Sequence, residues 1–399
     1  MPSNKKSSKS KAKAANRNLN NETVVVLKRL LSAIKELDNK GKNQTITPPN
    51  VAIPINHYRD ITPELEGAYK MLEDGANLIK NVSTKYTLLG KINVEDGSKY
   101  TTELRQASEL ISTSAFLVHQ PNVGCALATR TVIKQKCSSI LNSVIALVES
   151  FVSLKALDGN VGAQLTGAVW SACDQVLENF PKGNRTCMRR EMFTWVRDCN
   201  DTMEEFQELI DLSTNGEDDT ESEVNDEDQY SSKELDVAKA SLALIKCSRG
   251  IINLSMKASE CAGAELSELE KKLQSEDHSD DEESKKVIKM RKLSNLQWIN
   301  NLHETCRLVG EGMTNLGCVM YPPLNVSDAV EWTDTEIGAQ ASEQTKCLLE
   351  AAHMIDNPIL GDDPKTIVMN DEVKEMCSKL ISAIEHRSKE VQEGIKTLL

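Results

Sequence analysis

The sequence predicts an all-α protein made of two antiparallel helical bundles joined by an acidic linker. Aromatic residues are only 4% of the 399, which is few for β-sheets, because sheets draw on aromatic and β-branched side chains. Leucine and isoleucine recur at helical spacing along most of the chain. A stretch with many acids and few apolar residues interrupts this pattern. The expected parts are a disordered basic tail 1–20, an N-terminal bundle 21–212, an acidic disordered linker 213–231, and a C-terminal bundle 232–399 with an acidic loop at 275–285.

Six helical segments are expected before the acidic linker. Their order is a first helix with the stripe Leu27, Leu30, Leu31, Ile34 and Leu37, a second from Pro63 through Ile79, and further helices at about 100–118, 122–157, 163–179 and 186–212. The 122–157 segment is apolar on nearly all sides, so it should be central in its bundle. Phe180-Pro181-Lys182-Gly183-Asn184 contains strong helix breakers and predicts a tight reversal between the last two helices.

Four long helices are expected after the linker. They cover about 233–273, a segment from about Leu293 to Leu316, about 326–354, and a final segment from about Met369 almost to the end. Tyr321-Pro322-Pro323 ends the second of these, because two consecutive prolines remove backbone donors and restrict the residue before them. Long helices joined by short connections favour an antiparallel bundle.

The net charge of −13 is concentrated in two short runs. Residues 216–229 hold eight acids and no base, and residues 276–283 hold six acids. The rest of the chain is therefore close to neutral and lacks the clustered Lys and Arg that nucleic-acid phosphates require, so direct nucleic-acid binding is not expected. The lysines between Lys5 and Lys13 form a basic tail, which is either a nuclear-import signal or a solvated terminus.

We expect a protein of the cytoplasm and nucleus that does not bind membranes. No apolar segment reaches the roughly 20 residues needed to span a bilayer, and the first residues do not form an apolar signal region. Eleven cysteines are spread singly, without a Cys-x-x-Cys pair. This distribution predicts reduced, buried thiols and neither disulfides nor a zinc site.

The sequence predicts no enzymatic activity and no catalytic, metal-binding or cofactor-binding residues. It has no phosphate-binding loop, no His-Glu-x-x-His and no Gly-x-Ser-x-Gly. His303 and Cys306 would share one face of a helix, but zinc needs four ligands, so a structural role is favoured. A di-iron site would need Glu-x-x-His on paired helices, and this interpretation is not favoured.

Two kinds of residue leave an alternative open. Trp170, Trp195, Trp298 and Trp332 lie on or beside predicted helices, where core packing is the default and an exposed interaction anchor is the alternative. Ser279 precedes Asp280, Asp281 and Glu282. It is therefore a candidate phosphorylation site for an acid-directed kinase, in a segment that is already negative.

Two motifs resemble those of the Grap2 and cyclin-D-interacting protein (GCIP) family. Val169-Trp170-Ser171-Ala172-Cys173-Asp174-Gln175, followed by Pro181 and Asn184, is similar to the family's Val-Trp-x-Ala-Cys-x-Gln and Pro-x-x-Asn pattern. Tyr321-Pro322-Pro323 is similar to the family's Tyr-Pro-Pro element. The family carries an acidic insertion between these motifs, as this chain does at 213–231. We expect both motifs to serve helix packing rather than partner contact.

The resemblance implies a fold and a set of partners. It implies antiparallel helical bundles similar to the talin, vinculin and α-catenin class. It also implies binding of a D-type cyclin, of a Grap2-like adaptor and of helix-loop-helix transcription factors, with negative regulation of cell-cycle progression. Since apolar faces inside a bundle are already buried, we expect recognition through exposed bundle surface. The alternative function is a cytoskeletal or adhesion scaffold.

Overall fold

The computed structural model describes residues 4–37, 57–89, 94–120, 123–153, 155, 160–215, 229–275, 282–326, 329–358 and 367–399. These ranges contain ten α-helices and no strand, which confirms the all-α prediction. The helices are α1 (Asn4–Lys35), α2 (Pro63–Leu89), α3 (Val94–Val118), α4 (Leu127–Val152), α5 (Val161–Leu177), α6 (Asn184–Asn215), α7 (Ser232–Ser275), α8 (Glu282–Cys318), α9 (Glu336–Asp356) and α10 (Asp371–Leu398). None of the described helices is both long enough and apolar enough to cross a membrane.

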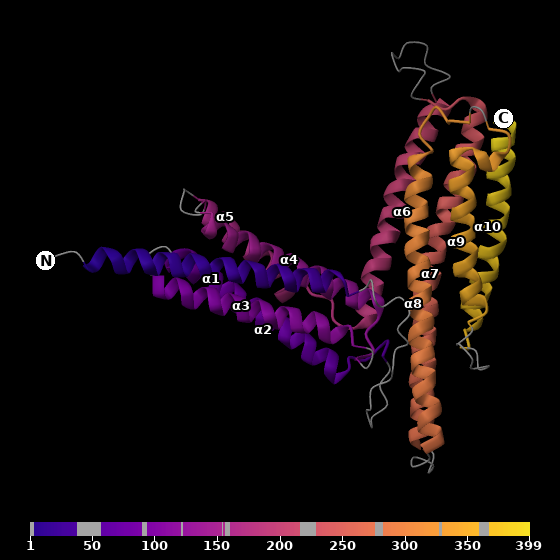
Figure 1. Ribbon diagram of the computed structural model, residues 1–399. Helices are drawn as coiled ribbons and strands as arrows, with labels where there is room; N and C mark the ends of the chain where they lie inside the picture. The colour runs from indigo at the N-terminus through magenta and orange to yellow at the C-terminus, as the bar shows by residue number, and fades with distance from the viewer. Residues whose placement is uncertain are drawn as a thin grey trace. The chain divides into compact units, whose positions relative to one another are not determined.

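The chain divides into two compact units, residues 1–187 and residues 188–399. In the first unit, α3 lies between α1 and α2, and α5 lies between α2 and α4 (Figure 1). The α4 helix also contacts α1 and α3, and its buried side chains include Ile133, Ile140, Leu141 and Val144. It is therefore central to this unit, as expected, although Thr131, Ser138 and Asn142 give it one partly exposed polar face.

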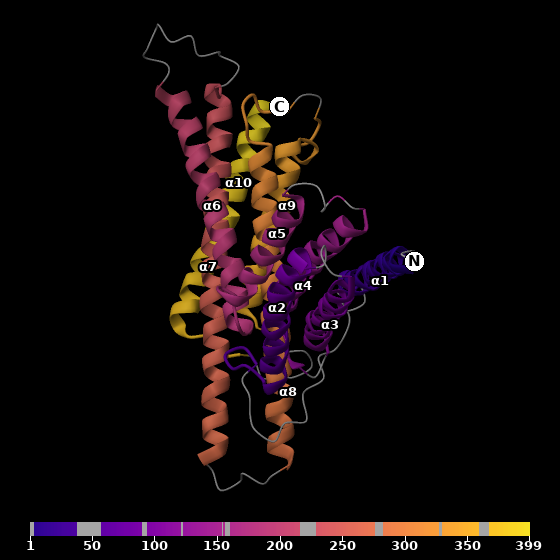
Figure 2. The same cartoon turned by 90° about the vertical axis from the view of Figure 1, so that its left-hand side faces the viewer.

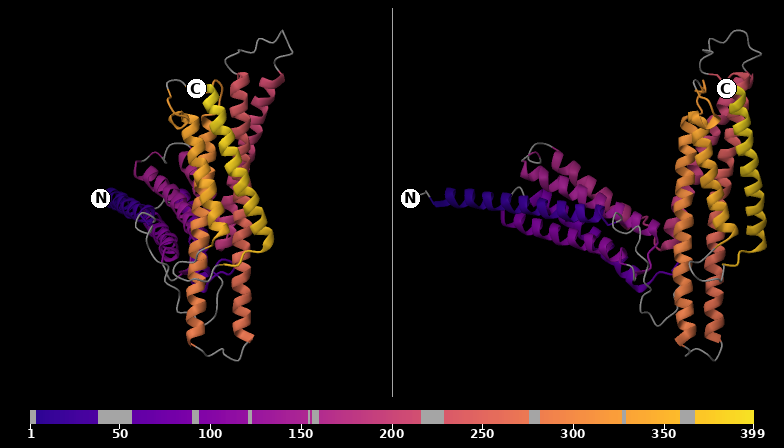
Figure 3. Two further views of the ribbon diagram at one scale, coloured as in Figure 1. Left: turned by 90° about the vertical axis from the view of Figure 1, so that its right-hand side faces the viewer. Right: turned by 45° about the vertical axis from the view of Figure 1, so that its right-hand side comes forward.

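The second unit contains α6 from Met188 onward together with α7, α8, α9 and α10 (Figure 2). Two contacts show that α7 and α8 run in opposite directions. Arg291 on α8 bonds Glu265 on α7 at 2.6 Å, whereas the later Cys306 of α8 lies near the earlier Ser255 of α7. The α9 helix likewise packs against both α8 and α10 (Figure 3). The α7 and α8 helices are thus antiparallel, as expected for helices joined by a short connection.

A buried glutamine holds α7, α8 and α9 together at one level. Gln344 on α9 is fully buried, and its Nε2 donates to Ser248 Oγ at 2.8 Å and to Val309 O at 3.0 Å. These two bonds satisfy the amide N–H groups, whereas Gln344 Oε1 is buried without a hydrogen-bond partner among the described residues. Gly312 on α8 makes room for it, because a Cβ there would lie 2.1 Å from Gln344 Oε1.

Several predicted boundaries differ from the structure; the helix expected at about 122–157, for example, is α4, Leu127–Val152. The disordered tail 1–20 is wrong for residues 4–20, which belong to α1, because the Ala and Lys residues among them favour helix even without an apolar stripe. The helix expected from about 326 starts at Glu336, where the Thr335 side chain accepts a hydrogen bond from Gly338 N and caps it. A short 3-10 helix, Trp332–Asp334, precedes it.

Another difference concerns the boundary between the two units. It lies between Cys187 and Met188 rather than at 213–231, because α6 beyond Met188 packs on α7 and α8. Of the acidic runs, 216–228 and 276–281, with Ser279, lie outside the described residues. Tyr230 N donates to Ser213 Oγ at 3.0 Å, so these two described residues, on either side of the first run, lie in contact. Residues 282–285, expected in the second acidic loop, belong to α8.

We predict that Gly312→Ala lowers the free energy of unfolding by about 1–3 kcal/mol, because the new methyl group would displace the Gln344 amide from its bonds. Urea unfolding followed by circular dichroism measures this. Gly167→Ala on α5 is the matched control, since its Cβ would meet open space. That change should stabilise the protein by about 0.5–1 kcal/mol through helix propensity. Equal stability of Gly312→Ala and the parent would contradict the proposed role of Gln344.

Candidate protein-interaction surface

Asn184 closes the end of the first unit with four hydrogen bonds. It is the first residue of α6, and its side chain is 2% exposed. Its Oδ1 accepts from Ala126 N at 2.8 Å and from Thr129 Oγ1 at 2.9 Å. Its Nδ2 donates to His57 O at 2.5 Å and to Gly124 O at 2.9 Å. Every donor and acceptor of the amide is thus used, and three separate segments meet at one side chain.

The residues around Asn184 also hold this end of the first unit together. Gly183 has φ +83° and its N–H donates to the Tyr69 hydroxyl at 2.8 Å. Gly124 has φ +66°, and a Cβ there would lie 2.5 Å from His57 Nδ1, so this turn needs glycine. Pro181 is buried and its carbonyl accepts from the Cys187 thiol. Pro181 and Asn184 of the first motif therefore both make packing or hydrogen-bond contacts at this end of the first unit.

The Val-Trp-x-Ala-Cys part of the motif is divided between core and surface. Val169, Ala172 and Cys173 are buried against the neighbouring helices. Trp170, in contrast, is 40% exposed, and Gln175 is exposed too. Core packing, the default expectation for Trp170, is therefore wrong. The residue lies at the edge of α5, where it meets α2.

Trp170 is held at this edge by its neighbours. Its Nε1 donates to Lys80 O at 3.2 Å, and Lys80 Nζ lies 5.8 Å from the centroid of the ring. Lys80 Nζ also lies 2.5 Å from Asp174 Oδ1, and this hydrogen bond raises the pKa of the lysine. On the other side of α5, Lys136 of α4 donates to Gln175 Oε1 at 2.8 Å. We call Lys80, Lys136, Trp170, Asp174 and Gln175 the α5 surface.

Between these edges, α5 presents small uncharged residues to solvent. Ala163, Gly167 and Ser171 recur four residues apart and are exposed. No charged residue occurs from Val161 to Cys173. Exposed helix faces of soluble proteins ordinarily carry charged and polar side chains. This face is therefore flat and easily desolvated, with a fixed indole ring at one side.

The Tyr321-Pro322-Pro323 motif joins three helices of the second unit. The Tyr321 hydroxyl donates to the Glu205 carboxylate of α6, and its ring lies 5.2 Å from that of Phe206. Leu324 N donates to Glu234 Oε1 of α7 at 2.7 Å, while Glu234 Oε2 accepts from Ser231 N at 2.8 Å in a capping arrangement. Pro322 and Pro323, linked by a cis peptide bond, occupy the turn after α8. The motif thus sets where α8 ends.

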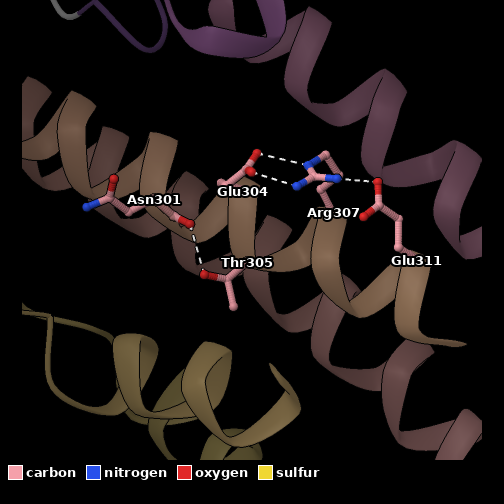
Figure 4. Close-up of polar contacts among 5 residues, drawn as sticks. All are labelled: Asn301, Glu304, Thr305, Arg307 and Glu311. Atoms are coloured by element: carbon pink, nitrogen blue, oxygen red, sulfur yellow. Dashed lines mark hydrogen bonds and ion pairs between the residues drawn. The ribbon is translucent and has the colours of Figure 1, made fainter. Parts of the chain in front are cut away.

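An ion-pair cluster lies along the exposed side of α8 (Figure 4). Arg307 donates to both carboxylate oxygens of Glu304, at 3.0 and 2.7 Å, and also to Glu311. Thr305 donates to the carbonyl oxygen of Asn301 at 3.1 Å. All these pairs lie within one helix and near solvent, where they add little to stability.

His303 and Cys306 are both buried in the second unit. His303 Nε2 lies 3.1 Å from Glu191 Oε2 of α6, and its ring lies 5.1 Å from that of Trp195. Cys306 is buried, and burial raises the pKa of its thiol to about 12. Within the described ranges, no group of three or more His, Cys, Asp or Glu side chains could hold a metal ion.

Side-chain exposure and burial also argue against a di-iron site and against reactive cysteines among the described residues. Glu350-Ala351-Ala352-His353 is a Glu-x-x-His sequence on α9, but both its acid and its histidine are exposed, whereas a di-iron site projects such groups into a bundle core. Burial raises the pKa of the Cys137, Cys173 and Cys199 thiols to about 12 as well. At neutral pH these thiols stay protonated and are poor nucleophiles.

The remaining tryptophans differ in burial. Trp298 is buried, and its Nε1 donates to Met354 O at 3.0 Å, as core packing predicts. Trp195 and Trp332 are half-buried. Sequence reasoning missed Lys80 and Lys136, because each lies in a different helix from the motif residue that it contacts, and no local pattern marks them.

We predict that Asn184→Ala lowers the free energy of unfolding by about 3 kcal/mol, because it leaves several buried backbone groups without partners. Asn184→Asp should be similarly harmful, since it puts an oxygen where Nδ2 faces the His57 and Gly124 carbonyls. Gln175→Ala is the exposed control and should change stability by no more than about 0.5 kcal/mol. Urea unfolding of the three variants measures the differences. A stable Asn184→Ala variant would show that the network is dispensable.

Comparison with known proteins bears on this unit. No curated protein matches the chain. The family model described as "Grap2 and cyclin-D-interacting, N-terminal" matches residues 71–212, which run from α2 to near the end of α6 and include the first motif. The match confirms the resemblance seen in the sequence. Over residues 71–212 the chain is therefore similar to the N-terminal domain of the Grap2 and cyclin-D-interacting family.

Proposed function

We propose that this protein is a non-enzymatic regulator that binds a D-type cyclin, and that the α5 surface supplies the contact. The observation that carries the proposal is the family match over residues 71–212, because this region contains the whole of α5. The family description names cyclin D and Grap2 as partners of its members.

The α5 surface has the physical properties of a protein-binding site. Interfaces draw most of their binding energy from a few large side chains, and tryptophan is prominent among them. Trp170 exposes part of its ring while its N–H is already bonded to Lys80 O, so little rotamer entropy is lost when a partner covers it. The small side chains of Ala163, Gly167 and Ser171 allow a partner helix to approach the α5 backbone closely.

A D-type cyclin is the partner that we propose first, and a Grap2-like adaptor is the second. Pairing with helix-loop-helix transcription factors would need an apolar helix face that is free to pair. In α2 that face, including Leu65, Leu72 and Ile79, is buried in the first unit. We therefore propose that helix-loop-helix factors, like the cyclin, are recognised through exposed surface and not by exchange of core helices.

The proposed regulation follows from this protein covering part of the cyclin surface. A non-enzymatic regulator of this kind would act by covering a surface that the cyclin needs for its kinase or substrate. We propose that it does so in the cytoplasm and nucleus and thereby restrains cell-cycle progression.

We predict that Trp170→Ala weakens binding to a purified D-type cyclin at least about tenfold, equivalent to about 1.4 kcal/mol. Calorimetry with the full chain and the cyclin–kinase complex measures the affinity. Leu88→Ala on α2 is the matched control, because Leu88 is an exposed large apolar residue of the same unit outside the α5 surface. Its affinity should equal that of the parent.

Circular dichroism and thermal unfolding establish that both variants are folded. Unchanged affinity of a folded Trp170→Ala variant would move the contact away from α5. Failure of the parent itself to bind any D-type cyclin would contradict the proposed function. Co-sedimentation with actin by the same preparation would then favour the scaffold alternative.

A further inference from the structure

The outward face of α6 in the second unit is segregated by charge. Between Met188 and Arg197 the helix carries Arg189, Arg190 and Arg197 and a single acid, Glu191. Between Asp198 and Asn215 it carries six acids and neither lysine nor arginine. Helix stability does not explain this order, because the macrodipole favours acids near the N-terminus and bases near the C-terminus. Its first turn has no acid and its last turn has no base.

Six exposed residues of this segment form one row. Phe193, Arg197, Asp201, Glu204, Glu208 and Leu212 follow one another at steps of three or four residues and are all exposed. Such steps place side chains on a single helix face. We call these six residues the α6 row. The opposite face of α6 is buried through Met192, Cys199, Phe206 and Ile210.

Two large apolar side chains lie at opposite ends of the α6 row. Phe193 is 51% exposed and Leu212 is 63% exposed. The Arg189 guanidinium lies 5.5 Å from the centroid of the Phe193 ring and bonds Glu260 of α7 at 3.1 Å, which holds the basic end in place. Arg197 is 69% exposed and pairs only with the adjacent Asp198, at 3.3 Å, among the ion pairs of the described residues. A pair between sequence neighbours at the surface is weak and readily exchanged.

A helix face that is basic at one end and acidic at the other is complementary to itself when two copies run antiparallel. A two-fold axis passing between Asn200 and Asp201 brings Arg197 opposite Glu204 of the second copy. By symmetry the same ion pair forms twice. Phe193 of each copy then lies opposite Glu208 and within one turn of Leu212 of the other. The complementary contacts in this register are thus the two Arg197–Glu204 ion pairs, with Phe193 and Leu212 of the two copies within reach of each other.

We propose that the α6 row is a self-association surface through which two copies of this chain pair antiparallel. The row from Phe193 to Leu212 is about 29 Å long at 1.5 Å per residue. A single helix face of this length buries less area than the roughly 1,200 Å² or more of a standard stable interface. The pairing is accordingly weak, reversible and sensitive to salt, because its ion pairs lie near solvent. It is independent of cyclin binding, which we assign to α5.

Sedimentation equilibrium of the full chain over a range of concentrations tests the proposal. At low salt the weight-average mass should rise with concentration from 44.1 kDa towards twice that value. In molar salt it should remain near the monomer mass. Arg197→Glu should weaken the self-association at least about tenfold, because symmetry removes two ion pairs and creates two repulsions.

A charge-swap experiment identifies the surface. Glu204→Arg with Glu208→Arg should fail to self-associate, as should Arg197→Glu, but an equimolar mixture of the two variants should form a heterodimer. Lys374→Glu on α10 is the matched control, since it makes the same charge change at an exposed site of the same unit. It should associate as the parent does. Circular dichroism shows that each variant is folded.

Two results would overturn the proposal. One is a parent that remains at the monomer mass at every concentration in low salt. The other is an Arg197→Glu variant that associates as strongly as the parent and gains nothing from mixing with the Glu204→Arg and Glu208→Arg variant.

Discussion

The side chain of Asn184 is the constraint on which the first unit depends. One amide satisfies backbone or hydroxyl groups of His57, Gly124, Ala126 and Thr129, which belong to the segment before α2 and to the start of α4. Because these groups are buried, an apolar side chain at this position would leave them without partners. The breaker residues predict the turn at Gly183, but the closure of this end depends on Asn184 contacts with residues at least 55 positions away along the chain, which only the fold brings together.

The α5 helix lies along α2 and α4 next to this end of the unit. The residues of its motif are divided between core and surface. Val169, Ala172 and Cys173 face the core, while Trp170 and Gln175 are turned to Lys80 and Lys136 on the two flanking helices. The same seven-residue motif thus both packs the unit and orders an exposed indole. In our proposal, packing and partner recognition use separate faces of this one helix.

Most helices could be predicted because apolar residues at helical spacing report directly on burial, as in the α10 stripe from Val373 to Ile395. The α1 extension to Asn4 has no such stripe, and its side-chain chemistry alone did not distinguish helix from tail. The predicted unit boundary was wrong because composition shows only where charged residues are concentrated, whereas contacts between helices determine where a unit ends. Lys80 and Asp174 are 94 residues apart, so only the fold brings them together. Thr335 is a recognisable N-cap that could have placed the start of α9.

Hydrogen exchange of the full chain, measured with and without a saturating D-type cyclin, tests the central claim most directly. The account predicts slower exchange in peptides covering residues 161–178, where the partner covers α5. Peptides at residues 123–130 should be unchanged, since Asn184 already protects Ala126 N there. Bound cyclin without added protection over 161–178, or with protection confined to residues 232–399, would contradict the account.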